Sequence, residues 1–297
     1  MFRLTILVMR PLPLRTAYFV AARVADVCYP LFRRQRRNLN ENLARVLATR
    51  DRREVDRVAR RAFRNFGRFV VDFVHFPTMT RDEIRRRLRF DDWDNLNALY
   101  GQGKGVVIVT LHFGVWDLGA ASLAAYDYPV NAVGDVFPYP KLTELVFESR
   151  ERLGMKVVPV TSVGPGLVRA LRRGEMVALL IDVDAPGQSV TVEFFGAPTT
   201  VSAGPARLAL RMGAAVMPAV VLRGDDDPTH VIPVIDASLR FEPTGDEEAD
   251  VRALTQAIMR SLEQQVRKHP EQWYIFRRMW ASSWFDKAAP PSEEPAE

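Results

Sequence analysis

The sequence predicts an α/β fold in which helices flank a central, twisted and largely parallel sheet. From about residue 106 onward, short apolar runs rich in β-branched residues alternate with segments of helical periodicity, which is typical of parallel sheets. The first run, 106–110, is Val-Val-Ile-Val-Thr and predicts a strand buried on both faces. The preceding hundred residues space their apolar side chains as amphipathic helices do, so we expect helices before the sheet.

The N-terminal hundred residues predict five helices, over 14–32, 38–47, 51–75, 81–89 and 93–100. The longest of them, 51–75, has a broad apolar stripe opposite its arginines and ends before Pro77. The first, 14–32, is apolar except for Arg23 and Asp26 and falls short of the roughly 20 uncharged residues that cross a bilayer. We therefore expect it to lie in a membrane interface or to pack on the domain.

The rest of the chain predicts alternating strands and helices. Strands are expected at 106–110, 130–134, 156–160, 175–182, 188–195, 216–222 and 230–235, and helices after Gly114 and at 139–153, 164–173, 205–212 and 247–268. The acidic segment 225–228 would join the last two strands as a turn. We expect a single domain over 1–287, with a basic helical part (1–75) and an α/β core (76–287), and a disordered Pro- and Glu-rich tail at 288–297.

Charge is distributed unevenly along the chain. Residues 1–90 contain 22 Arg and 8 Asp or Glu, a net charge of +14, which leaves −9 for the remainder of a chain with a total of +5. An arginine-rich end indicates an anionic partner such as a membrane surface, nucleic acid or a phosphorylated carrier. The alternative is an arginine-rich composition with solvated helix faces. We expect peripheral binding to anionic membranes through this helical part, without a spanning helix or a signal peptide after the apolar run 4–9.

Cys28 is the only cysteine, so an intrachain disulfide is excluded and a reducing compartment is favoured. We expect it to be a small apolar residue and not a nucleophile. Several motifs are absent from the sequence: no Gly-x-Ser-x-Gly is present, and no His, Cys and acidic residues have metal-ligand spacing. The glycines of 101–105 precede their strand and therefore form neither a dinucleotide fingerprint nor a P-loop.

His112 is the strongest candidate for chemistry. It ends the buried strand, and Gly114 then allows a tight turn into a helix that starts near Trp116. Open α/β sheets bind their ligands at this end of the strands. Asp117 lies one turn away and is expected to fold back on the imidazole, which gives a base that takes a proton from a hydroxyl. The alternative is a structural histidine beside an apolar strand.

A second informative stretch is 182–207. Asp182 and Asp184 directly follow a buried strand, and Glu193 stands in an otherwise apolar strand, either facing solvent or held near a charged partner. Gly204-Pro-Ala206 opens a helix whose N-terminus is suited to an anion or an oxyanion. We place Asp182 and Arg207 among the substrate-binding residues.

Four segments together resemble the lysophospholipid acyltransferase superfamily, and in it the branch of bacterial lipid A and phosphatidylinositol mannoside acyltransferases. The signature of the superfamily is His, four residues, then Asp or Glu, and it matches His112-Phe-Gly-Val-Trp-Asp117. The other segments are Val192-Glu-Phe-Phe-Gly196, Gly204-Pro-Ala206 and Pro270-Glu-Gln-Trp-Tyr-Ile-Phe-Arg-Arg-Met-Trp280. The resemblance extends over nearly the whole chain. Val115 and Val183 stand where relatives often have Asn and Gln.

This resemblance implies transfer of a fatty acyl group from acyl-CoA or acyl carrier protein to a hydroxyl of a membrane glycolipid. The transfer would occur at the cytoplasmic face of the plasma (inner) membrane. It implies His112 as general base, Asp117 as its orienting acid, Glu193 as a further partner of the histidine and Arg150 as a substrate or carrier contact. No metal or cofactor is expected, because a thioester is already activated. Backbone amides after His112 and arginines are both candidates for stabilising the oxyanion, and the sequence does not select between them.

Other functions stay open at this point. A lysophosphatidic acid or other glycerolipid acyltransferase shares the same chemistry, and a thioesterase would use water in place of the acceptor. An arginine-rich nucleic-acid-binding protein is disfavoured, because the arginines lie on amphipathic helices and no recognised nucleic-acid motif accompanies them. The acceptor, the acyl chain length and the oligomeric state are open.

Overall fold

The structure is a computed structural model that describes residues 12–134, 136, 139–160, 163–183 and 187–285. The expectations for the apolar run 4–9, for Asp184 and for the tail 288–297 therefore lie outside the described residues. Within the described part of the chain, no helix combines the length and the apolar character needed to cross a membrane.

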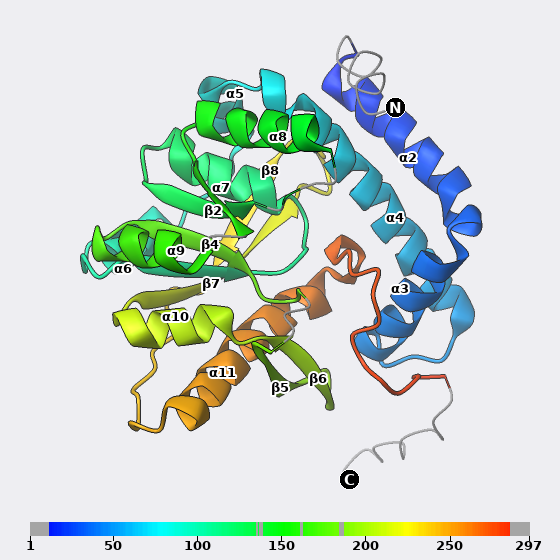
Figure 1. The fold of residues 1–297 in the computed structure, drawn as a ribbon. Coiled ribbons are helices and arrows are strands. Elements are labelled where there is room, and N and C mark those ends of the chain that lie inside the picture. The colour runs from blue at the N-terminus through cyan, green and yellow to red at the C-terminus, as the bar shows by residue number, and fades with distance from the viewer. Residues whose placement is uncertain (1–11, 135, 137–138, 161–162, 184–186, 286–297) are drawn as a thin grey trace.

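A six-stranded sheet forms the centre of the fold (Figure 1). Its strands are β1 (Val106–Thr110), β2 (Val130–Gly134), β3 (Lys156–Pro159), β4 (Met176–Leu180), β7 (Ala215–Arg223) and β8 (Val231–Ile235). They are arranged in the order β3-β2-β4-β1-β7-β8, and every neighbouring pair is parallel except β7 and β8. The predicted α/β fold with a largely parallel sheet is thereby confirmed.

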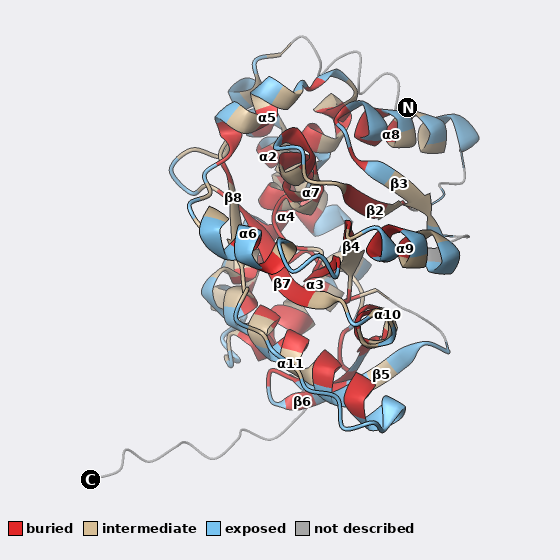
Figure 2. Cartoon of the chain, turned by 90° about the vertical axis from the view of Figure 1, so that its left-hand side faces the viewer, coloured by how far each residue is buried: buried red, intermediate tan, exposed pale blue. Residues whose placement is uncertain are grey.

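Helices cover both faces of this sheet, and the central strand β1 alternates between them. Val107 and Val109 join a core with α9 (Val163–Arg172), α10 (Gly204–Met212) and α11 (Glu247–Lys268). Val106 and Ile108 join a second core with α6 (Trp93–Tyr100) and α7 (Trp116–Ala125). Burying both faces explains the unbroken apolar run of β1. Figure 2 shows this buried centre, whereas the outer surfaces of α8 (Pro140–Arg152) and α9 are exposed.

A separate hairpin of β5 (Ser189–Phe194) and β6 (Ala197–Ser202) packs on α11. The first of these strands was predicted and the second was not. β6 contains Pro198 and few large apolar residues, so its sequence resembles a loop. The hairpin turn consists of Phe195 and Gly196, and both residues have positive φ. Such turns usually have Asn or Asp before the glycine, so a phenylalanine at the first position does not indicate a turn in the sequence.

The N-terminal helices α2 (Leu14–Leu31), α3 (Arg33–Val46) and α4 (Arg52–His75) form a layer beside the sheet domain (Figure 1). A buried ionic network attaches this layer to the rest of the fold. The Asp72 carboxylate of α4 accepts hydrogen bonds from Tyr18 of α2, from Arg87 of α5 (Arg81–Arg87) and from Arg223 of β7. Burial raises the pKa of Asp72, but the two guanidinium charges outweigh this and lower it.

The segment after α11 connects the helical layer with the sheet. It begins with a single 3-10 turn (Pro270–Gln272) and continues through residues 273–285. The side chain of Asn42 on α3 donates to the carbonyls of Ile275 and Arg277, and the Phe276 ring packs edge-on against Phe63 of α4. This segment therefore reaches the sheet at the carboxyl end of β1, where His112 lies.

Candidate active site

His112 and Asp182 are brought together by the register of two parallel strands. Thr110 of β1 pairs with Leu180 of β4, so the residues two positions further on leave the sheet side by side. The imidazole Nδ1 of His112 lies 2.9 Å from Asp182 Oδ1. The backbone N–H of His112 donates to both carboxylate oxygens, at 3.2 and 3.0 Å. Asp182 was expected to bind substrate; the structure instead makes it the carboxylate that holds the imidazole.

Asp182 is completely buried and accepts several hydrogen bonds. Trp273 Nε1 donates to its Oδ2 at 3.2 Å, and the guanidinium of Arg277 donates to its backbone carbonyl. Burial alone would raise the pKa of this carboxyl group, but the charge of His112 and the hydrogen bonds from His112 and Trp273 lower it. We therefore treat Asp182 as an ionised acceptor.

An ionised carboxylate can only accept hydrogen bonds, so the proton of the neutral imidazole must be on Nδ1. The other ring nitrogen, Nε2, then carries the lone pair and can act as a base. A buried carboxylate on Nδ1 also stabilises the imidazolium that forms after proton transfer. His112 itself is partly accessible, with 30% of its side chain exposed, so a substrate hydroxyl can approach it.

The turn after His112 is fixed by close backbone contacts. Gly114 has a φ of 60°, and a Cβ at this position would lie 1.8 Å from the carbonyl oxygen of Val221. Only glycine fits here. The amides of Phe113, Gly114 and Val115 all donate to protein carbonyls. The amides of these three residues, one of the two candidate sets of oxyanion donors, are therefore already hydrogen-bonded within the protein.

Asp117 and Arg150 form an ion pair at the first turn of α7. Arg150 Nη2 of α8 lies 2.7 Å from Asp117 Oδ1, and both side chains are almost buried. The carboxylate on Nδ1 of His112 is that of Asp182 in this structure, and the orienting role of Asp117 stays a prediction. Arg150, expected to contact substrate or carrier, has its charge balanced by Asp117 at the start of α7.

Glu193 and Arg207 are not brought to His112. Glu193 lies on the outer face of the β5–β6 hairpin and is exposed, while its neighbour Phe194 packs inward against Trp273. The alternation of side chains along a strand explains this placement. Arg207 of α10 pairs with Glu248 of α11. In this structure Glu193 is exposed on the hairpin and Arg207 pairs with Glu248, and the roles predicted for both residues stay predictions.

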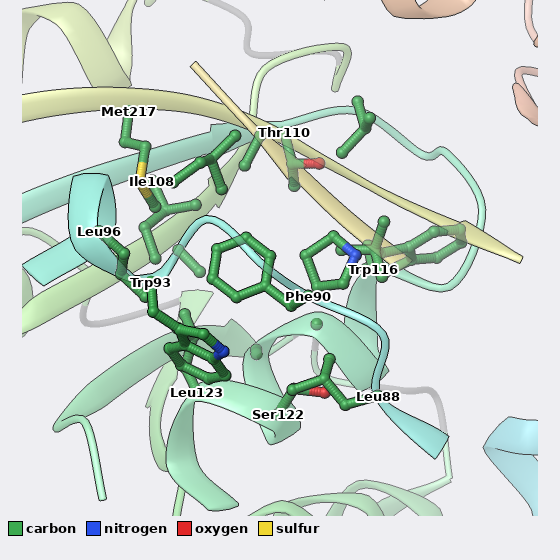
Figure 3. Close-up of a pocket in the computed structure, with 18 residues that line it drawn as sticks. Leu88, Phe90, Trp93, Leu96, Ile108, Thr110, Trp116, Ser122, Leu123 and Met217 are labelled. Carbon is green, nitrogen blue, oxygen red and sulfur yellow. The ribbon is translucent and has the colours of Figure 1, made fainter. Parts of the chain in front are cut away.

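An apolar cavity lies beside the catalytic turn, between the sheet and α7 (Figure 3). Thr110 and Trp116 lie toward one end of it, and Leu96 and Met217 lie toward the other. The Trp116 ring is 5.2 Å from the imidazole of His112, measured between centroids. His112 itself is not a lining residue, and the wall of the cavity consists mostly of aliphatic and aromatic side chains. Among the described residues, no group of His, Cys, Asp or Glu side chains is placed to hold a metal ion.

Sequence comparison identifies the family. The family model of the bacterial lipid A biosynthesis acyltransferases matches residues 2–282. The chain belongs to this family. It is similar to phosphatidylinositol mannoside acyltransferases from Mycobacterium tuberculosis (28% identity over 249 residues, 82% of this chain and 76% of the relative) and Mycolicibacterium smegmatis (28% over 254 residues, 84% and 81%).

The family membership confirms the resemblance found in the sequence, and the protein is an acyltransferase of the lipid A and phosphatidylinositol mannoside type. The sequence named His112, Asp182, Asp117 and Arg150 as candidates, and the structure places them in two contacting pairs; the sequence did not indicate that Trp273 and Arg277 contact Asp182. The only signal for them was the segment 270–280, which carries the family resemblance at a distance of more than 150 residues from His112.

Proposed function

We propose that this enzyme transfers a fatty acyl group from an acyl thioester, acyl-CoA or acyl carrier protein, to a hydroxyl of a membrane glycolipid of the phosphatidylinositol mannoside type. The His112–Asp182 pair at the carboxyl end of the central strands carries the proposal. The names of the mycobacterial relatives favour this acceptor over a lipid A precursor. A lysophosphatidic acid acceptor is the alternative.

In the proposed reaction, Nε2 of His112 takes the proton of the acceptor hydroxyl as its oxygen attacks the thioester carbonyl. The tetrahedral intermediate then collapses, the C–S bond breaks, and the imidazolium returns its proton to the leaving thiolate. Asp182 remains ionised and keeps the imidazole in the productive tautomer. We expect no cofactor or metal, because the thioester supplies the activation.

The apolar cavity beside Trp116 supports an acyl substrate. A fatty acyl chain gains about 0.8 kcal/mol for each methylene that leaves water, so an apolar wall provides binding energy for the chain. Trp116 lines the cavity and its ring lies 5.2 Å from the imidazole, so a chain that enters the cavity beside Trp116 would place its thioester near His112. We propose that this cavity, of about 60 Å³, receives a part of the donor's acyl chain and not its whole length.

A transfer assay with purified enzyme tests the function. Palmitoyl-CoA is offered with phosphatidylinositol mannosides, a lipid A precursor or lysophosphatidic acid in separate reactions, and the products are analysed by mass spectrometry. We expect one added palmitoyl group on the mannoside and little on the other acceptors. Preferred acylation of lysophosphatidic acid would establish the alternative, and release of free palmitate without any acylated lipid would indicate a thioesterase.

We further propose that α2 is the membrane contact and that the enzyme binds peripherally to the cytoplasmic face of the membrane. One side of α2 packs on α4, while Phe19, Val24, Val27 and Leu31 on the other side are 55–70% exposed. Arg33 and Arg34, which follow directly, are also exposed. An exposed apolar helix face with adjacent arginines has the composition of an interfacial helix on anionic lipid.

Vesicle binding tests this surface. Changing Val24 and Val27 together to Asp should weaken binding to phosphatidylglycerol vesicles by about tenfold or more, because burying one valine is worth about 1.5 kcal/mol or more. The matched control is Val160→Asp, since Val160 is also exposed but follows β3 of the sheet and does not belong to α2. Unchanged binding of the α2 variant would refute the proposal, and tight salt-dependent binding to DNA with none to vesicles would favour a nucleic-acid partner.

A further inference from the structure

We propose that the indole N–H of Trp273 is a positioning group for the catalytic pair, which orients the Asp182 carboxylate so that Asp182 in turn orients His112. This inference rests on the proposed role of His112 as general base. It concerns a residue 161 positions from His112 in the chain and assigns a function to the segment 270–280.

The two carboxylate oxygens of Asp182 face different donors. Oδ1 lies 2.9 Å from Nδ1 of the imidazole, whereas Oδ2 accepts from the Trp273 indole at 3.2 Å. The backbone N–H of His112 lies between them and reaches both oxygens. The indole is thus a side-chain donor that distinguishes Oδ2 from Oδ1. Without it, only the shared backbone N–H would hold Oδ2, and the carboxylate would hold the neutral imidazole in a less defined orientation.

Trp273 is itself held at the catalytic turn. Its backbone forms an antiparallel bridge with Phe113, in which Gly114 N donates to Gln272 O and Tyr274 N donates to His112 O. The Gln272 side chain pairs with both backbone groups of Arg223 on β7. Segment 272–274 and the turn after His112 are therefore parts of one rigid unit. This fixed geometry lets a single N–H group define the orientation of Asp182.

The hydrogen bond from the indole affects the basicity of the Asp182 carboxylate. Among the described residues, His112 contacts the Asp182 carboxylate, Arg277 donates to the Asp182 carbonyl, and Asp117 pairs with Arg150. The indole donates to the carboxylate and disperses its negative charge. Its loss makes the carboxylate more basic, so the carboxylate holds the imidazolium more strongly and His112 should titrate at higher pH.

Trp280 provides a matched control within the same aromatic cluster. Its ring packs edge-on to Trp273 at 6.3 Å between centroids, and it is equally buried. Its indole also donates one hydrogen bond, at 3.1 Å, but to the carbonyl of Phe194 and not to Asp182. A change of either tryptophan to Phe removes one buried N–H donor and part of one ring, and only Trp273→Phe affects the catalytic carboxylate.

The experiment compares Trp273→Phe with Trp280→Phe by turnover, pH profile and 15N NMR titration of the histidines. We expect Trp273→Phe to lower kcat by about 10- to 100-fold, the range for a hydrogen bond to a charged group, with little change in KM for palmitoyl-CoA. The acid limb of the pH profile and the midpoint of the His112 titration should both move to higher pH. Trp280→Phe should leave both near wild type.

Equal kinetic and NMR effects of the two variants would overturn the proposal. If Trp273→Phe does not fold, Trp273 is replaced by β-(3-benzothienyl)alanine, which keeps the bicyclic shape and lacks the N–H; an unshifted His112 titration in that protein would also overturn it. The NMR titration requires no substrate. It therefore still tests the positioning role if wild-type enzyme transfers no acyl group, in which case only the proposed function fails.

Discussion

His112→Ala is expected to reduce acyl transfer by about 10²- to 10⁴-fold, the usual contribution of a general base. The imidazole is the group in the described structure that combines a carboxylate on one nitrogen with partial exposure at the end of the central strand. Removing it leaves the acceptor hydroxyl protonated and a poor nucleophile. The measurement is kcat for transfer from palmitoyl-CoA, together with the thermal unfolding midpoint.

The control for this change is His230→Ala. His230 lies in the turn between β7 and β8, next to Arg89 and Asp227, and has no contact with the catalytic turn in the described structure. Its loss should leave turnover within about twofold of wild type, as is usual for a surface substitution. Near wild-type turnover of a folded His112→Ala enzyme would show that another group removes the proton.

Much of the fold follows from local pattern. The β-branched run of β1 and the alternation after it predict a parallel sheet, and Gly114 predicts the sharp turn that follows His112. The position of His112 at a strand end therefore could be predicted. Its partner could not be assigned, because the order of strands in a sheet is set by packing over the whole chain. Once β4 is known to be the neighbour of β1, Asp182 is expected beside His112, because each lies two positions after one of the paired residues Thr110 and Leu180.

Side-chain direction limited the remaining predictions. Asp117 follows His112 closely in sequence, but its carboxylate at the start of α7 meets Arg150 of α8, a contact between two helices that spacing does not reveal. Glu193 belongs to the same stretch as Asp182, yet alternation along β5 turns it to solvent. Trp273 contacts the site only because the segment after α11 returns to the turn after His112. Such returns depend on tertiary packing and leave no local periodicity.

Asp182→Asn is the change that tests the pair most directly, and we expect a loss of turnover of roughly 10³- to 10⁴-fold, as for the corresponding change in a Ser-His-Asp triad. The substitution preserves size and can still accept from Trp273 through its carbonyl oxygen. Its NH2 group would then face Nδ1 of His112, which must accept instead of donate. The proton of the neutral imidazole moves to Nε2, and the base is lost although the geometry is kept.

Substitution of two other carboxylates tests whether the effect of Asp182→Asn is caused only by the loss of a negative charge. Glu193→Gln should retain near wild-type turnover, because Glu193 is exposed on the hairpin. Asp117→Asn disturbs the pair with Arg150 and should leave the proton of the neutral His112 on Nδ1, whereas Asp182→Asn should move it to Nε2. The 15N shifts of His112 distinguish the two tautomers without any substrate. If Asp117→Asn moves the proton to Nε2 and Asp182→Asn does not, the orienting acid is Asp117, and the short contact between Asp182 and the imidazole has a structural role only.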